Sequence, residues 1–294
     1  MPRYVGRFAP SPTGDLHLGT LTAAAAGFIH ARQSGGAWLV RIENIDPPRE
    51  VPGSADRILR ALEALELEWD GEVHYQKTRL EAHLAVAREL VARNAAYHCD
   101  CSRRQIRLLT GDTRYPGTCR NRALLAGDTA IRLRIGKEPV AFADGIQGRV
   151  VRDIEARDGD FVIVRRDGLA AYHLAVVLDD AWQGVTDVVR GADLLDSTPL
   201  HLCVQRTLGL QTPNYWHIPV ITDATGEKLS KSAGAAALDA SRPGRAAAGA
   251  LALLGLDVPR ELEGSPPREL WQFAVAHWRI DTLAARPGPI AFAP

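Results

Sequence analysis

A segment near the N-terminus contains residues suited to holding a nucleotide. It reads Pro10-Ser-Pro-Thr-Gly-Asp-Leu-His-Leu-Gly-Thr20, and it joins a short apolar stretch to an alanine-rich one. Gly19 lets the backbone approach a nucleotide closely, and His17 and Thr20 offer polar hydrogens to phosphate oxygens. His-x-Gly-Thr alone is a weak signal, because an ordinary helix start with a histidine has the same pattern. Phosphate binding is therefore favoured only together with a second feature.

The second feature is a pair of lysines far along the chain. Lys228-Leu-Ser-Lys-Ser232 contains two of the four lysines in the sequence and follows another apolar stretch. Lysines at this place can neutralise the charge that builds up as pyrophosphate leaves a triphosphate. Taken alone, the segment also fits a solvated surface turn. Both segments follow predicted strands, where open α/β sheets bind nucleotides, so the combination favours ATP chemistry.

Three of the four cysteines lie close together in the sequence, at Cys99, Cys101 and Cys119. Thiolates suit zinc, and a closed site with four ligands would be structural. From the residues alone, His98 or Asp100 is the candidate for the fourth ligand. Cys203 stands apart and is expected in the core. The alternative interpretation of the cluster is three buried thiols without a metal.

The cysteine cluster is also rich in arginine. Two acidic residues, Asp100 and Asp112, stand against the arginines of this segment, which are Arg103, Arg104, Arg107, Arg114, Arg120 and Arg122. Such a local excess of positive charge fits contact with an RNA backbone, although solvated arginine clusters are common.

The elements that must position these residues alternate between strand and helix. The apolar patterns predict a strand at Tyr4–Phe8, a helix from Asp15 or His17 to Arg32, a strand at Ala37–Glu43 and helices near Ile58–Leu65 and Arg79–Arg93. The alternation stops after Tyr97 and resumes with a strand at Val185–Val189, a helix at Leu194–Leu208 and a strand at Tyr215–Ile221. This order predicts the α/β class, with a Rossmann-like, doubly wound parallel sheet.

Four segments follow from this pattern. We expect the two halves of a catalytic domain at residues 1–96 and 171–240, and an inserted, zinc-bearing subdomain at 97–170. Short strands are expected inside the insertion at Ala130–Ile135 and Phe161–Val164. Residues 241–294 are predicted to form a short tail of two or three helices.

The composition is that of a soluble enzyme. Of the 294 residues, 46% are hydrophobic and 24% charged, and the formal net charge is zero, so no global charge indicates a polyanionic partner. The apolar run Leu21–Ile29 is too short to span a membrane, and no signal peptide is evident. Four cysteines do not form a secreted disulfide framework. We expect a cytoplasmic protein without membrane contact, and we favour a monomer.

The two nucleotide-binding segments together resemble the two signatures of class I aminoacyl-tRNA synthetases. The resemblance is closest to the glutamyl branch and extends in order from residue 3 to residue 232. It is carried by Arg7-Phe-Ala-Pro-Ser-Pro-Thr-Gly14, Arg41-Ile-Glu43, Leu178-Asp-Asp180, Val189-Arg-Gly191 and Ser197-Thr-Pro199.

The resemblance implies an amino-acid site for glutamate. It assigns Arg7 and Ser11 to the substrate, Glu43 to the α-ammonium group, and Tyr172 and Arg190 to the carboxylates. Arginine forks suit carboxylates, which supports the assignment chemically. Taken singly, Glu43 also fits a strand-end carboxylate that pairs with Arg41 or Arg49, and Arg190 fits a surface ion pair.

The resemblance also implies an ATP site and a catalytic set. The implied catalytic residues are His17, Thr20, Lys228 and Lys231. The implied ATP contacts are Pro10, Thr13, Gly14, His17, Gly19, Thr20, Lys228, Ser230 and Lys231. Mg²⁺ is expected to accompany ATP, with no residue that must bind it.

Two positions differ from the pattern of many glutamyl enzymes. A third, Thr20, replaces the histidine of the first class I signature, as is usual in this branch. Asn44 stands where an aspartate is common, which removes one acidic contact. Val176 replaces an asparagine near the substrate, which predicts looser or altered glutamate binding.

Length indicates the subtype. Sixty-two residues follow Ser232, fewer than a typical domain of about 100–150 residues. The chain therefore resembles the glutamyl-queuosine tRNA(Asp) synthetases, short paralogues of glutamyl-tRNA synthetase that attach glutamate to queuosine in tRNA(Asp). That family's zinc site matches Cys99, Cys101, Tyr115 and Cys119. The resemblance implies glutamate activation without tRNA, and L-glutamate, ATP and queuosine-containing tRNA(Asp) as partners.

Two other functions stay open at this point. One is a glutamyl-tRNA synthetase core that charges tRNA(Glu) with the help of a separate anticodon reader. The other is a non-catalytic paralogue that binds tRNA or glutamate, although intact His17, Lys228 and Lys231 argue against it.

Overall fold

The computed structural model describes residues 4–222, 242–285 and 289–291. Its helices are α1 (Leu18–Gln33), α2 (Ser54–Ala64), α3 (Leu80–Ala92), α4 (Arg103–Thr110), α5 (Ile154–Arg157), α6 (Tyr172–Trp182), α7 (Thr198–Leu208), α8 (Pro243–Leu253) and α9 (Pro267–His277). Its strands are β1 (Val5–Phe8), β2 (Ala37–Ile42), β3 (His74–Tyr75), β4 (Ala96–Cys99), β5 (Ala130–Leu133), β6 (Val140–Asp144), β7 (Gly148–Arg152), β8 (Val162–Val164), β9 (Asp187–Gly191), β10 (Asn214–Ile218), β11 (Ile221–Thr222) and β12 (Ile290–Ala291).

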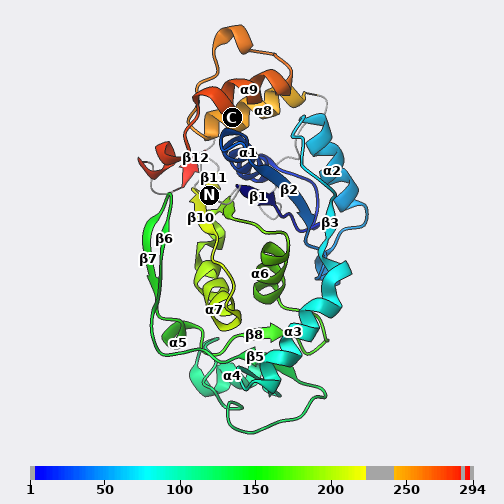
Figure 1. Cartoon of the computed structure of the whole chain (residues 1–294), viewed down its shortest axis with the longest axis vertical. Helices are drawn as coiled ribbons and strands as arrows, with labels where there is room; N and C mark the ends of the chain where they lie inside the picture. The colour runs from blue at the N-terminus through cyan, green and yellow to red at the C-terminus, as the bar shows by residue number, and fades with distance from the viewer. Residues whose placement is uncertain (1–3, 223–241, 286–288, 292–294) are drawn as a thin grey trace.

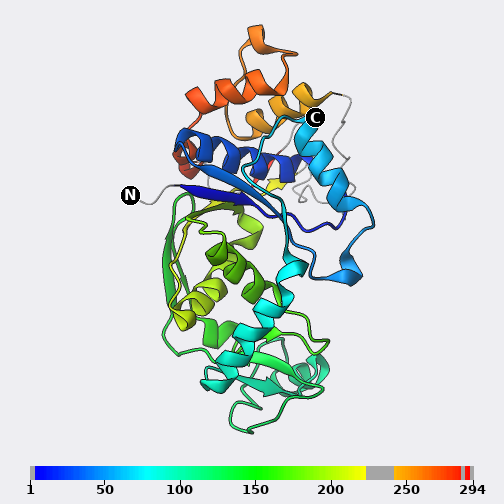
Figure 2. The same ribbon diagram turned by 45° about the vertical axis from the view of Figure 1, so that its right-hand side comes forward.

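The central sheet is parallel and joins the two halves of the predicted catalytic domain. β1 pairs with β2, β2 pairs with β3, and β9 pairs with β10, all in parallel. β1 also lies beside β9, where the backbone N–H of Thr186 donates to the Val5 carbonyl at 2.9 Å. The spatial order is therefore β3-β2-β1-β9-β10. α1 covers one face, and α6 and α7 lie on the other (Figure 2). The predicted doubly wound α/β sheet is confirmed.

Several predicted boundaries shift by a few residues. The strand expected at Val185–Val189 is β9, two residues later, at Asp187–Gly191. The helix expected from Leu194 begins only at Thr198, because a 3-10 turn at Ala192–Ser197 precedes it. β10 ends at Ile218, one residue before Pro219, since proline cannot donate to a sheet ladder.

A second, antiparallel sheet lies at the far end of the elongated molecule (Figure 1). It has the order β4-β5-β8, and α4 lies beside it (Figure 1). The β6–β7 hairpin runs back from this end toward the central sheet, where β6 pairs in parallel with β10 through Asp144 and Tyr215. The predicted insertion thus contributes a strand next to the catalytic sheet, and its boundaries at residues 97 and 170 stay a prediction.

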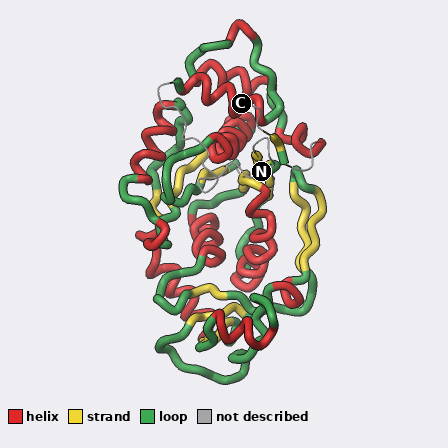
Figure 3. Tube along the Cα trace, turned by 180° about the vertical axis from the view of Figure 1, so that it is seen from behind, coloured by secondary structure: helices red, strands yellow, loops and turns green. Residues whose placement is uncertain are grey.

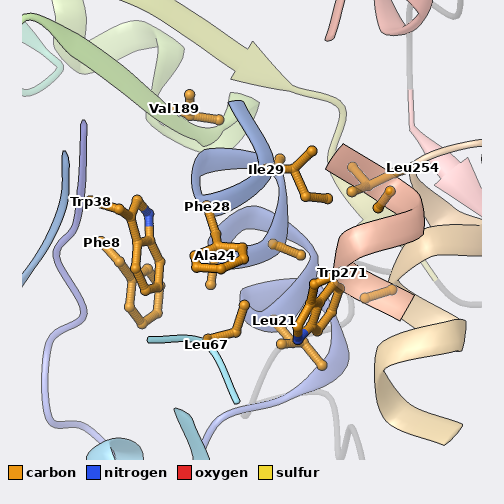
Figure 4. Packing of buried hydrophobic residues seen from close by; sticks show 14 of the residues in the cluster. Phe8, Leu21, Ala24, Phe28, Ile29, Trp38, Leu67, Val189, Leu254 and Trp271 are labelled. Carbon is orange, nitrogen blue, oxygen red and sulfur yellow. The ribbon is translucent and has the colours of Figure 1, made fainter. Parts of the chain in front are cut away.

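The main core surrounds α1, whose alanines allow close packing on several sides. Leu21, Ala24 and Ile29 are fully or almost fully buried. Figure 4 shows Phe28 between Trp38 of β2 and Trp271 of α9, with ring centroids 5.4 and 6.5 Å apart. Full burial of a large apolar side chain stabilises the fold by about 1.5–3 kcal/mol. The core therefore holds the strand that precedes α1 and the strand that follows it in fixed positions.

The predicted helical tail is part of this core. α8 and α9 pack over the outer side of α1, at the opposite end of the molecule from α4 (Figures 1 and 3). The indole N–H of Trp271 donates to the Leu65 carbonyl at 2.7 Å, and that of Trp278 donates to the Leu254 carbonyl at 3.0 Å. The tail thus closes the hydrophobic core on the side of α1 that faces away from the sheet.

Candidate active site and cysteine cluster

A cleft of about 910 Å³ opens at the carboxyl ends of β1, β2, β9 and β10. Open α/β sheets bind their ligands at this edge, because the loops that follow the strands meet there. The cleft brings together most of the predicted glutamate and ATP residues, namely Arg7, Pro10, Ser11, Thr13, His17, Gly19, Thr20, Glu43, Tyr172 and Arg190. Residues as far apart in the chain as Arg7 and Arg190 thus face one space.

The N-terminus of α1 forms the phosphate side of this cleft. His17 is the N-cap residue, and its Nδ1 accepts from the backbone N–H of Thr20 at 3.3 Å. The Thr20 hydroxyl lies 2.7 Å from Nε2 of the same ring. A helix N-terminus carries partial positive charge and unpaired N–H groups, which favours anions.

Gly14 supports the loop that leads into α1 and is not among the described residues that line the cleft. Its φ of 137° lies in a region that favours glycine. Its N–H donates to the Ser54 hydroxyl at 3.1 Å, and that hydroxyl donates to the Gly14 carbonyl at 2.7 Å. Gly14 thus connects the loop to α2, and direct contact with ATP stays a prediction.

A buried ion-pair network holds two of the predicted glutamate ligands. Asp180 Oδ1 accepts from Arg7 Nε at 3.2 Å and from Arg41 Nη2 at 2.7 Å. Arg41 Nη2 also donates to Glu43 Oε1 at 3.3 Å. Glu43 therefore does pair with Arg41, as one interpretation of the sequence proposed, and at the same time lines the cleft.

Burial and charge act in opposite directions on these carboxylates. Burial raises the pKa of Glu43 above its usual value, although the charges of Arg41 and Arg7 oppose this. Burial also raises the pKa of Asp180, but Arg7 and Arg41 more than offset it, so its pKa lies below the usual value. Asp180 is therefore the permanent anion of the network, and Glu43 is the carboxylate that a substrate ammonium group would stabilise.

Arg190 lines the same cleft from β9. Its side chain is 5% exposed, so the interpretation as a surface ion pair is wrong. Nη1 donates to the Tyr172 hydroxyl at 3.3 Å, Nη2 donates to Thr198 Oγ1 at 2.8 Å, and Nε donates to His217 Nε2 at 3.0 Å. These contacts fix the plane of the guanidinium with one edge toward the cleft.

The two departures from the family pattern have defined surroundings. Asn44 Oδ1 accepts from the backbone N–H of Lys77 at 2.9 Å, a contact for which an amide oxygen serves as well as a carboxylate. Val176 is buried in a hydrophobic cluster on α6. The effect of either residue on glutamate affinity stays a prediction. Lys228, Ser230 and Lys231 lie outside the described residues.

Sequence reasoning missed four residues of this site. Three of them, Arg41, Asp180 and Thr198, stand within segments that resemble the glutamyl branch, and these segments were a signal that could have indicated them. His217 lies in an apolar strand without any motif and reaches Arg190 only through the pairing of β9 with β10. No sequence signal indicated it.

The three clustered cysteines do come together in space. Their sulfur atoms all lie within 4.8 Å of one another, and Cys101 Sγ is 3.5 Å from Cys119 Sγ. The Tyr115 hydroxyl lies 3.3 Å from Cys99 Sγ and accepts from the backbone N–H of Cys119 at 2.8 Å. One phenol oxygen and three sulfurs therefore face one small volume, as four ligands of a tetrahedral zinc ion would.

The other candidates for the fourth ligand fit less well. His98 Nδ1 is 2.9 Å from the Thr129 hydroxyl, and Asp100 Oδ1 lies 2.9 Å from Arg122 Nη1 and 3.1 Å from Cys119 Sγ. Among the described residues, neither belongs to the group of ligand atoms that surrounds one point. Cys203 lies on α7, partly buried against the same hydrophobic cluster that contains Val176.

Arg132 is a further residue of the cysteine cluster that the sequence did not indicate. Its guanidinium lies over the Tyr115 ring, 3.7 Å from the centroid, and its Nε donates to Cys99 Sγ at 3.3 Å. Burial by itself raises the pKa of the Cys99 thiol, but its hydrogen bonds with Tyr115 and Arg132 bring it below its usual value. A buried cation beside the sulfur favours the thiolate that a metal would bind.

The arginine-rich segment divides into two groups. Arg114 and Arg120 donate to backbone carbonyls, and Arg122 pairs with Asp100. The second group lies on α4 and consists of the exposed side chains of Arg103, Arg104 and Arg107.

Within the described residues, no helix is long and apolar enough to cross a membrane.

Known proteins of similar sequence agree with this geometry. A sequence profile described as "tRNA synthetases class I (E and Q), catalytic domain" matches residues 4–246. The chain is 50% identical over 275 residues to a glutamyl-Q tRNA(Asp) synthetase from Ectopseudomonas mendocina, covering 94% of this chain and 93% of that one. It is 49% identical over 287 residues to one from Pseudomonas aeruginosa, covering 97% of both chains.

Solved structures support the fold. A glutamate-tRNA synthetase from Elizabethkingia anophelis superposes with a TM-score of 0.82 at 24% identity, covering 99% of this chain and 68% of that one. A glutamate tRNA ligase from Elizabethkingia meningosepticum gives a TM-score of 0.79 at 23% identity, covering 98% and 67%. The sequence matches, together with a cleft that gathers the family's signature residues, show that the chain belongs to the class I aminoacyl-tRNA synthetases and, among these, to the glutamyl-Q tRNA(Asp) synthetase family.

Proposed function

We propose that this chain activates L-glutamate with ATP, without tRNA, and transfers the glutamyl group to queuosine in tRNA(Asp). The observation that carries the proposal is the cleft itself. It places two buried arginines and one buried glutamate beside the N-terminus of a helix. Glutamate has two carboxylates and one ammonium group, and this arrangement has matching charges within reach of a phosphate-binding terminus.

The first step forms an adenylate. The substrate α-carboxylate attacks the α-phosphorus of ATP, a P–O bond forms, and pyrophosphate leaves with the electrons of the bond that breaks. Glu43 holds the α-ammonium group, and Arg7, Tyr172 and Arg190 orient the carboxylates. His17 and Thr20 hold phosphate oxygens. Catalysis is then mostly positioning and electrostatics, so no protein nucleophile is required.

Lys228 and Lys231 are proposed to neutralise the departing pyrophosphate, with Ser230 as a further ATP contact. Mg²⁺ bound to the ATP phosphates would spread their charge and assist the same departure. In the second step, a hydroxyl of the queuosine ring attacks the glutamyl carbonyl. An ester bond forms, AMP leaves, and the hydroxyl proton passes to the AMP phosphate or to solvent.

We further propose that Cys99, Cys101, Cys119 and Tyr115 hold one structural zinc ion. Its role would be to tie the turn that follows β4 to the loop that ends at Cys119, so that α4 keeps its place. A zinc ion with four protein ligands keeps no open position for chemistry. The exposed arginines of α4 would then present a fixed basic surface to the tRNA backbone.

Transfer of labelled glutamate tests the proposed activity. The protein is mixed with ATP, labelled L-glutamate and tRNA from cells that contain or lack queuosine. We expect label on queuosine-containing tRNA(Asp), and loss of that label when periodate first oxidises the queuosine diol. ATP–pyrophosphate exchange should depend on glutamate and proceed without tRNA. Label on tRNA(Glu) regardless of queuosine would instead identify a glutamyl-tRNA synthetase core.

A substitution pair tests the role of the pocket. Arg190→Gln removes the guanidinium and should raise the KM for glutamate in the exchange reaction. Arg206→Gln, on the exposed end of α7, serves as the control and should leave that KM unchanged. Equal effects of the two substitutions would argue against a glutamate site at Arg190.

A further inference from the structure

Asp144 comes from the predicted insertion and lies behind the proposed glutamate pocket. It is the last residue of β6, where the β6–β7 hairpin pairs with the central sheet, and its side chain is buried. Its Oδ1 atom accepts three backbone N–H groups, those of Ile146 at 3.0 Å, Gln147 at 2.9 Å and His217 at 3.2 Å. Its Oδ2 atom lies 2.5 Å from His217 Nδ1. The two carboxylate oxygens therefore have separate tasks.

This contact determines where the proton of His217 lies. An ionised carboxylate only accepts hydrogen bonds, so Nδ1 of His217 carries the hydrogen and Nε2 keeps its lone pair. Burial lowers the pKa of His217 and, with the charge of Arg190, outweighs the opposing effect of Asp144, so the ring is neutral near pH 7. Nε2 is then the acceptor for Arg190 Nε at 3.0 Å, with the Thr198 hydroxyl 3.1 Å away.

The lone pair on His217 fixes one edge of Arg190. With Nε directed at His217, Nη2 donates to Thr198 Oγ1 at 2.8 Å and to the Leu194 carbonyl at 3.3 Å. The Nη1 group is left at the cleft, where it donates to the Tyr172 hydroxyl at 3.3 Å. A guanidinium held on two sides has lost its rotational freedom before a substrate arrives, which lowers the entropy cost of binding.

We propose that Asp144 and His217 are positioning residues that set the orientation of Arg190 for a glutamate carboxylate. Asp144 selects the tautomer of His217, and His217 directs the guanidinium. The proposal rests on the proposed glutamate site, and it adds that a strand of the insertion takes part in amino-acid recognition. Both residues act from behind the pocket, since neither is among the described residues that line the cleft.

Asp144→Asn gives a sharp test because the backbone fixes the orientation of the new amide. The three backbone donors require an oxygen at the Oδ1 position, so the amide nitrogen must occupy the Oδ2 position. That nitrogen donates to His217 Nδ1 and moves the ring hydrogen to Nε2, where it faces the N–H of Arg190. Two donors then oppose each other, much as an asparagine in place of the catalytic aspartate imposes the wrong histidine tautomer in serine proteases.

Two substitutions of His217 separate positioning from simple packing. His217→Gln places an amide oxygen near the old Nε2 position, where it can still accept from Arg190. His217→Asn places its amide near the old Nδ1 position, where it can still bind Asp144 but not Arg190. If His217 has a purely structural role, His217→Asn should resemble the wild type more closely. If His217 positions Arg190, His217→Gln should resemble it more closely. His83→Asn is the control, since His83 forms a comparable buried pair with Asp179, with Nε2 2.7 Å from Oδ1.

Nitrogen NMR of the labelled full chain provides a readout that does not depend on activity. We expect His217 to carry its hydrogen on Nδ1 in the wild type and on Nε2 in Asp144→Asn. The Arg190 Nε–H signal should exchange slowly in the wild type and in His217→Gln, and rapidly in His217→Asn. An unchanged tautomer in Asp144→Asn, or equal exchange in the two His217 variants, would overturn the proposal even if the chain does not activate glutamate.

Kinetics then test the consequence for substrate. In glutamate-dependent ATP–pyrophosphate exchange, Asp144→Asn and His217→Asn should raise the KM for glutamate roughly tenfold or more, the size expected when a buried polar group loses its partner. The KM for ATP should stay within about twofold, because the phosphate side is untouched. His83→Asn should lower stability and leave the KM for glutamate unchanged. If the wild-type protein catalyses exchange and both variants keep its KM for glutamate, the positioning proposal is contradicted. If the wild-type protein catalyses no exchange, the proposed function is contradicted.

Discussion

The carboxylate of Asp180 on α6 accepts a hydrogen bond from Arg41 on β2 at 2.7 Å. Both side chains are buried, and Arg41 is only 1% exposed. Because Arg41 also contacts Glu43, this pair connects the helix that carries Tyr172 to the end of the strand that leads into Glu43, the predicted ammonium ligand. The proposed glutamate pocket is therefore built on an ion pair that is not among the described residues lining the cleft.

Asp180→Asn should destabilise the fold and disturb the pocket together. Removing one partner of a buried pair leaves the other charge uncompensated, at a cost of about 3–5 kcal/mol in the free energy of unfolding. Urea unfolding measures this loss. Asp128→Asn is the matched control, because Asp128 pairs with Arg166 at the surface and should cost about 1 kcal/mol or less. Similar losses in the two variants would refute the special role of Asp180.

Cys99→Ser should abolish stoichiometric zinc binding. Metal analysis of the purified protein should give one zinc per wild-type chain and a strongly reduced content in the variant, since a hydroxyl is a poor substitute for a thiolate. Cys203→Ser lies outside the cluster and should keep its zinc. A chelator should lower the melting temperature of the wild type and of Cys203→Ser. Wild-type protein that is free of metal but equally stable would argue for three unligated thiols.

Stability should fall between pH 7 and pH 5 because of buried neutral histidines. Burial, with the charge of Arg190, lowers the pKa of His201 well below its usual value. The unfolded chain then binds a proton near pH 6.5 that the folded chain does not, so the free energy of unfolding decreases as the pH falls through this range. For one such histidine the loss is about 2 kcal/mol between pH 7 and pH 5.

Urea unfolding at both pH values checks this expectation. His201→Gln should show a pH dependence that is weaker by the contribution of one histidine. His277→Gln, at an exposed position of α9, should keep the wild-type pH dependence. Identical curves for all three proteins would show that His201 does not titrate on unfolding in this range.

Trp271→Ala should unfold the molecule more easily, although Trp271 lies far from the cleft. The substitution removes a ring packed against Phe28 and a hydrogen bond to the Leu65 carbonyl. Loss of a buried aromatic side chain costs about 3–5 kcal/mol. Trp182→Ala, at a half-exposed ring under Arg79, should cost about 1 kcal/mol. Calorimetry of both variants measures the contribution of the tail to the core.

The exposed arginines of α4 should bind tRNA mainly through its phosphates. Replacing Arg103, Arg104 and Arg107 by glutamine should weaken tRNA binding. The slope of log K against log salt concentration should become shallower by roughly 0.7–0.9 for each phosphate that is no longer neutralised. The exchange reaction should be unaffected, since glutamate activation is proposed to proceed without tRNA. The same change at the exposed Arg60, Arg88 and Arg260 controls for net charge. Equal losses of tRNA affinity in both triple variants would show that the effect arises from overall charge and not from α4.

The sequence was most informative where local pattern and motif coincide. Alternation of apolar stretches placed β1, α1 and β2 within three residues of their observed bounds, and the segment before α1 lines the cleft where phosphate binding is predicted. The cysteine spacing likewise predicted the cluster that the structure brings together.

Contacts between distant strands could not be predicted from such patterns. Asp144 and His217 are separated by 73 residues, and their contact depends on the register of a hairpin that returns from the insertion. Arg132 reaches Cys99 only through the pairing of β4 with β5. The tail is also tied to the end of α2 by the hydrogen bond from the Trp271 indole to the Leu65 carbonyl, which no sequence period reveals.

The adjacency of β1 and β9 has a consequence for how the chain folds as it is made. Val5 and Thr186, which hydrogen-bond to each other across this junction, are 181 residues apart. At ribosomal rates of ~5–20 residues per second, β9 leaves the ribosome roughly 10–40 seconds after β1. During that interval the central edge of β1 has no native neighbour. Nascent chains therefore need protection at this edge, and folding of the sheet is completed late in synthesis.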